Sequence, residues 1–73
     1  MIDRNKLKKL LRARLDGRVT DAQIALLAEK LIEIKHPTRG EMEKISSEIT
    51  GSRVITESLD IDDIVTMLDQ ADQ

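Results

Sequence analysis

The sequence repeats one helix-start pattern four times within 73 residues. In each copy an apolar residue precedes an Asp or Thr, and another apolar residue follows four positions after that polar residue. This is the hydrophobic-staple spacing, in which the polar side chain caps a helix and the two apolar side chains fix its angle of entry. The four sets are Ile2–Asp3–Leu7, Val19–Thr20–Ile24, Pro37–Thr38–Met42 and Leu59–Asp60–Ile64. The pattern therefore predicts four helices.

Apolar periodicity and end signals set the bounds of these helices. Two starts add a capping box, Thr20 with Gln23 and Thr38 with Glu41. Gly17 is expected to end the first helix in a left-handed conformation, because glycine adopts positive φ without steric cost. The expected helices span about residues 4–15, 21–35, 39–50 and 61–71.

These helices predict an all-α fold, a compact bundle of four short helices in a single domain of residues 1–73. The 21–35 helix has the widest apolar arc, so we expect it to be central and to form an antiparallel hairpin with the 4–15 helix. Leu10 and Val65 lie in the apolar stripes of the first and last helices and are expected to face inward. Between the last two helices, Val54 and Ile55 are expected in a loop that tucks one of them into the core.

Composition narrows the class of protein. The chain has no cysteine, so we expect neither a disulfide nor a thiolate metal site, and the sequence fits a reducing compartment. It also has no Phe, Tyr or Trp, the side chains on which exposed bases stack. No apolar run approaches the roughly 20 residues of a membrane span. We therefore expect a cytoplasmic protein with an aliphatic core and no membrane partner.

The charges are distributed unevenly along the chain. Residues 1–35 carry nine Lys or Arg against five acids, and residues 36–73 carry three against nine. The asymmetry has two readings, an interaction surface or two halves of opposite charge that attract each other. In the second reading the basic 4–15 helix lies beside the acidic 61–71 helix, and the two neutralise each other inside the bundle.

Two groups of residues carry candidate chemistry. His36 is the only histidine in the chain, but it has no matching nucleophile motif and stands at a helix end, where a basic side chain suits the helix dipole. Asp60, Asp62 and Asp63 resemble the start of a calcium loop, but the glycine and the late glutamate of that loop are missing. We therefore expect no catalytic residue, no metal and no cofactor.

Two segments resemble known interaction elements. EKISSEITGSRVITESL, residues 43–59, resembles a repressor-type helix-turn-helix, although Gly51 stands one place late and Thr56 replaces a buried aliphatic residue. SLDIDDIVTMLDQ, residues 58–70, resembles the short acidic amphipathic helices at which modular synthase subunits dock to one another. The second resemblance implies a protein partner.

The sequence thus predicts a non-enzymatic protein–protein interaction module, such as a small regulator, inhibitor or docking domain. Its partner is expected to be another protein or a second copy in a homodimer, with no small-molecule substrate. The alternatives are a nucleic-acid-binding regulator that uses the basic face of the 4–15 helix, and a small enzyme built around His36. The residues expected to contact a partner are Leu26, Met67, Asp62, Asp63, Asp69, Lys8, Lys9 and Arg12.

Overall fold

The computed structural model describes residues 1–73 and contains five helices and no strand. The all-α bundle and its four predicted helices are confirmed, each end lying within one residue of its expected position. A fifth, short helix lies between the last two of them. In chain order the helices are α1 (Arg4–Leu15), α2 (Asp21–Ile34), α3 (Arg39–Thr50), α4 (Val54–Ser58) and α5 (Ile61–Ala71).

The predicted helix starts are capped as the sequence pattern requires. Each polar cap residue accepts a hydrogen bond from the backbone N–H three residues later. The capping boxes at Thr20 and Thr38 are present, and Asp60 forms a third one with Asp63. The apolar residue four positions after each cap is buried, so these local signals also orient each helix toward the core. These buried residues are Leu7, Ile24, Met42 and Ile64.

Three helix ends have positive φ, and the simplest is that of α3, which Gly51 ends with φ 70°. Gly17 has φ 81°, as predicted, and the left-handed conformation begins one residue earlier at Asp16. Lys35, which follows α2, has φ 68° and ψ −49°, and His36 N–H donates a 2.8 Å hydrogen bond to the Ile34 carbonyl. This is a γ-turn centred on a residue with a Cβ, a conformation that is strained.

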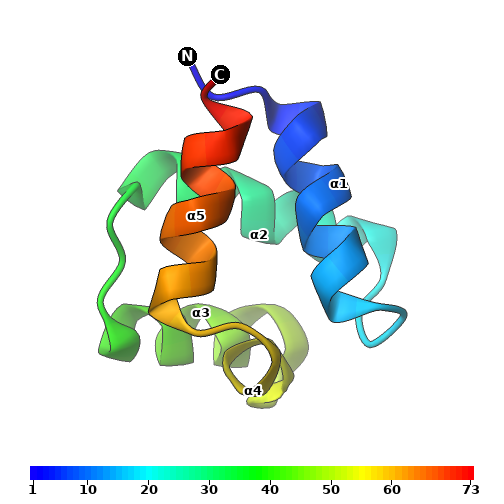
Figure 1. Ribbon diagram of the computed structural model, residues 1–73. Helices are drawn as coiled ribbons and strands as arrows, with labels where there is room; N and C mark the ends of the chain where they lie inside the picture. The colour runs from blue at the N-terminus through cyan, green and yellow to red at the C-terminus, as the bar shows by residue number, and fades with distance from the viewer.

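The helices are arranged with α1 and α5 side by side and antiparallel, while α2 crosses behind α1 (Figure 1). The crossing is steep, so α1 and α2 pack together but do not form the expected antiparallel hairpin. α2 packs against α1 and α3, whereas α1 packs against α2, α4 and α5. The expectation that the second helix is central is therefore wrong, because α1 contacts more of the other helices than α2 does. The N-terminal and C-terminal ends of the chain lie side by side and are joined by a 2.8 Å hydrogen bond, which Asp3 N–H donates to the Ala71 carbonyl.

The segment expected to be a loop is the short helix α4. Ile55 is fully buried and Val54 is half-buried, so the expectation that one of them enters the core is confirmed. Ser46, itself fully buried in α3, donates a 2.8 Å hydrogen bond to the Ser52 carbonyl and accepts one of 3.3 Å from Ile55 N–H. Residues 43–59 thus form helix, turn and helix, but the second helix has five residues and its central contacts go to the core.

Candidate functional site

Two of the six cations of α1 are neutralised by acids in the first half of the chain. Arg4 pairs with Glu29 at 2.8 Å and Arg12 with Asp21 at 3.1 Å, so both pairs join α1 to α2. One ion pair reaches α5, between Arg14 and Asp63 at 3.4 Å. The acidic helix α5 therefore neutralises one of the α1 cations, and the charge asymmetry of the sequence is only partly resolved inside the bundle.

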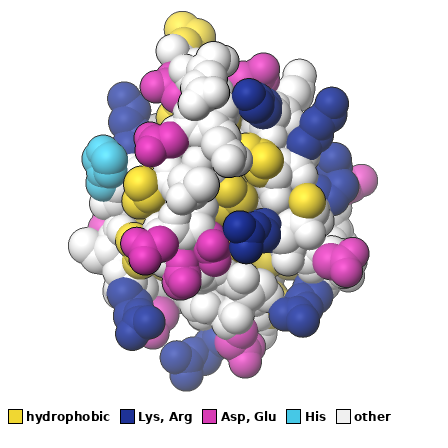
Figure 2. Space-filling model, viewed as in Figure 1, with side chains coloured by type: hydrophobic (Ala, Val, Ile, Leu, Met, Phe, Trp, Pro, Cys, Tyr) yellow, Lys and Arg dark blue, Asp and Glu magenta, His cyan; other side chains and the backbone are white.

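The charges left over lie on the outer sides of α1 and α5. Lys6 and Lys9 of α1 are exposed and have no acid within 4.0 Å. Asp62 and Asp69 of α5 are likewise exposed and have no cation within that distance. Figure 2 shows basic side chains over α1, and acidic side chains at the start of α5 and along the side of α5 that is away from α1. One face of the molecule therefore displays both signs, each on its own helix.

Apolar side chains lie among these charges. Leu10 and Val65, which were expected to face inward, are both half-buried, and Ala13 is exposed on α1. Figure 2 shows hydrophobic atoms at the surface between α1 and α5. We call the surface formed by Lys6, Lys9, Leu10, Asp62, Val65 and Asp69 the α1–α5 face.

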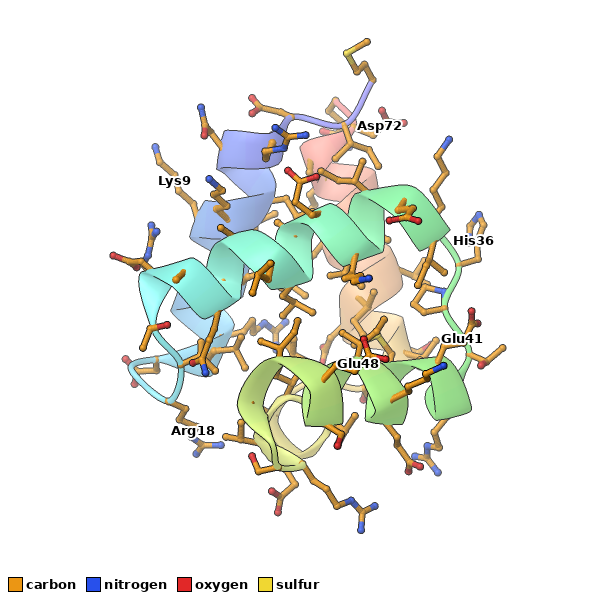
Figure 3. All side chains as sticks on the ribbon, turned by 180° about the vertical axis from the view of Figure 1, so that it is seen from behind. Lys9, Arg18, His36, Glu41, Glu48 and Asp72 are labelled. Atoms are coloured by element: carbon orange, nitrogen blue, oxygen red, sulfur yellow. The ribbon has the colours of Figure 1, made fainter.

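Helical geometry explains which residues reach this face. With a buried stripe of Leu7, Leu11 and Leu15, the 100° step per residue turns Lys6 and Lys9 outward and leaves Lys8 on a flank of the helix. Lys8 is accordingly half-buried, and Arg12, on the same flank, is bound to Asp21 of α2. Of the three predicted basic contacts, Lys9 is both exposed and unpaired. Figure 3 shows it pointing away from the body of the protein.

Lys6 was missed in the sequence. The signal that would have found it is its position on the helical wheel, one turn before Lys9 and opposite the leucine stripe.

Two predicted contact residues have structural positions instead. Met67 is 3 % exposed and belongs to the core, so its prediction as a surface contact is wrong. Asp63 is half-buried, where it completes the capping box with Asp60 and pairs with Arg14. Its carboxylate is therefore engaged within the protein.

Leu26 is exposed, as predicted, but it stands apart from the α1–α5 face. It is 54 % exposed on the outer side of α2, the helix that lies behind α1 and α5 in Figure 1. Charged residues Glu29 and Lys30 follow it on the same exposed surface. A single exposed leucine is common on protein surfaces, so Leu26 alone does not mark a candidate site, and the α1–α5 face is the stronger candidate.

The residues considered for chemistry are not brought together. His36 is exposed after the γ-turn and points away from the body of the protein (Figure 3). Asp60 and Asp63 cap the same helix, and the structure contains no group of three His, Cys, Asp or Glu placed to hold a metal.

The surface has two larger hollows, and neither adjoins the outward charges of α1. One, of about 220 Å³, lies between α3, α4 and α5 and has Met42 and Leu59 in its lining. The other, of about 390 Å³, lies where the chain ends meet and is lined by Ile2, Ile32 and Lys35, with Met1 and Asp72. Both mix a few apolar side chains with charged groups.

No helix has the length and apolar character needed to cross a membrane. Comparisons of the chain with protein-family models, characterised proteins and solved structures gave no match.

Proposed function

We propose that this protein is a non-enzymatic protein–protein interaction module that binds its partner through the α1–α5 face. The observation that carries the proposal is the set of exposed charges that the fold leaves without partners, Lys6 and Lys9 on α1 and Asp62 and Asp69 on α5. Arg4, Arg12 and Arg14 are paired within the fold, whereas these four residues remain free for a partner.

The chemistry of this surface suits a partner with segregated charges. Complementary charges steer association and fix its orientation more than they add affinity. The affinity must therefore come from apolar contacts, for which half-buried Leu10 and Val65 are available on this face. We place the module in the cytoplasm, because its cysteine-free composition fits a reducing compartment.

Capture from a lysate of the source cell tests the proposal when it is combined with charge reversal. The immobilised wild-type chain is compared with two face variants, Lys6→Glu plus Lys9→Glu and Asp62→Lys plus Asp69→Lys. The control is Lys30→Glu plus Lys44→Glu, which changes the same charge as the first variant at exposed, unpaired lysines of α2 and α3.

We expect a discrete protein to be retained by the wild type and the control after nuclease treatment, and to be lost from at least one face variant. Retention of no protein by the wild type, or retention by both face variants as strong as that by the wild type, would contradict the proposal.

The alternative function, binding of nucleic acid through Lys6, Lys8 and Lys9, has its own outcome in this experiment. Lys6 and Lys9 have no acid nearby, which is the observation that favours it. It predicts capture that is lost on nuclease treatment and weakens steeply with salt, because bound cations release counterions from the phosphate backbone.

A further inference from the structure

We propose that the α1–α5 face is a dimer interface and that its occupant is the same face of a second copy of this chain. The inference rests on the proposed function, because it names the partner of the same surface. Three features of the face carry it: the register of the two helices, the separation of charge between them, and the apolar residue between them.

The register of α1 and α5 is fixed at both ends. Arg14 pairs with Asp63 near one end, and Asp3 N–H bonds the Ala71 carbonyl at the other. Because the helices are antiparallel with a rise of about 1.5 Å per residue, Lys6 and Lys9 lie level with the last turns of α5. Asp69 is in those turns, so basic and acidic groups stand at the same height on neighbouring helices.

This arrangement selects one orientation for a twofold contact. A twofold axis that runs between the helices and parallel to them places α1 of one copy over α5 of the other. Lys6 and Lys9 then face Asp69 of the second copy, and the symmetry repeats the contact on the other side. A twofold axis perpendicular to the helices would instead place α1 over α1, with lysines facing lysines, and like charges disfavour that orientation.

The apolar residue between the helices suits the same axis. Leu10 is half-buried on the flank of α1 that faces α5, and therefore lies close to the proposed axis. Leu10 of each copy would meet Leu10 of the other, while the charged residues form the rim. An apolar centre with a polar rim is the usual composition of a protein interface.

The size of the molecule sets the expected strength. The protein exposes 4667 Å² of surface, and a weak complex buries about 600 Å² on each partner, roughly an eighth of this surface. The contact would use surface ion pairs and a small apolar centre, so we expect a dissociation constant in the micromolar range, of order 10–100 µM.

Sedimentation equilibrium of the purified full chain tests this inference, over about 1 µM to 1 mM protein. The experiment uses the wild type, the Lys6→Glu plus Lys9→Glu variant, the Asp62→Lys plus Asp69→Lys variant and the Lys30→Glu plus Lys44→Glu control. Far-UV circular dichroism establishes that each variant is folded. The decisive sample is an equimolar mixture of the two face variants.

We expect the wild type and the control to dimerise, and each face variant alone to have a dissociation constant at least about tenfold higher, because attraction becomes repulsion at both symmetry-related contacts. Mixing the two face variants should restore association to about the wild-type value, since each copy then meets the opposite charge. General loss of stability cannot produce this rescue.

Three results would overturn the inference: a wild type that is monomeric throughout the range, face variants that dimerise like the wild type, or a mixture no more associated than its components. Failure here is distinct from failure of the proposed function. A monomeric chain that still captures a different protein through the α1–α5 face would refute the dimer and leave the interaction module standing.

Discussion

Replacing Ser46 with alanine should destabilise the protein more than its small change in size suggests. The Ser46 hydroxyl is fully buried and connects α3 to α4 by two hydrogen bonds, to the Ser52 carbonyl and from Ile55 N–H. In the alanine variant the Ser52 carbonyl keeps the Thr50 hydroxyl as a partner at 3.2 Å. Ile55 N–H keeps none, and it is buried beside a side chain of the core.

The expected cost follows from these two bonds. A buried donor left without a partner costs about 1–3 kcal/mol, and the weakened bond to the carbonyl adds about 0.5–1 kcal/mol. Alanine returns up to about 0.5 kcal/mol of helix propensity. The free energy of unfolding should therefore fall by about 2 kcal/mol, a large share of the total for a domain of this size.

Urea unfolding measured by far-UV circular dichroism checks this value, since the chain has no aromatic residue to report by fluorescence. The matched control is Ser47→Ala, one position further along α3 and exposed, which should leave stability within about 0.5 kcal/mol of the wild type. If Ser46→Ala and Ser47→Ala unfolded at the same urea concentration, the hydrogen bonds of Ser46 would not stabilise the packing of α4 against α3.

Three further predictions concern stability and use the same unfolding measurement. Leu27→Ala should lower the free energy of unfolding by about 2–5 kcal/mol because Leu27 is fully buried, whereas Leu26→Ala beside it should change this free energy by less than about 0.5 kcal/mol. Similar losses in the two variants would show that α2 does not bury Leu27 and expose Leu26. Thr38→Ala should cost about 1 kcal/mol by removing the cap of α3, and an unchanged midpoint would contradict that role. Lys35→Gly should leave the protein at least as stable as the wild type because glycine relieves the strained γ-turn, whereas Lys30→Gly within α2 should cost about 1 kcal/mol; equal losses would refute the strain.

The helices could be predicted because their starts are local signals. Thr20 and Gln23, for example, satisfy each other's backbone groups within one turn, so the cap needs no information from elsewhere in the chain. The helix α4 could not be predicted in this way. It depends on the Ser46 hydroxyl, nine residues before Ile55, and on the burial of Ile55 against other helices.

The charge of the two helices that form the candidate site could be predicted from the sequence, but the residues that are exposed and unpaired on them could not. The sequence indicates a basic first helix and an acidic last helix, and both are present. Which charges stay free depends on the crossing of α1 and α2, which brings Asp21 to Arg12. The burial of Met67 likewise depends on how the helices pack: Asp63, one turn before it on α5, pairs with Arg14 of α1. The position of such a residue on the helical wheel, at the border of the apolar stripe, does not decide whether it is buried or exposed.

Backbone hydrogen–deuterium exchange of the protein, free and bound to the partner retained in the capture experiment, tests the binding surface most directly. If the α1–α5 face is that surface, binding will slow exchange in residues 4–15 and 61–71 and leave residues 21–34 and 39–50 unchanged. Slower exchange confined to the segment of α2 around Leu26, with α1 and α5 unaffected, would contradict the account.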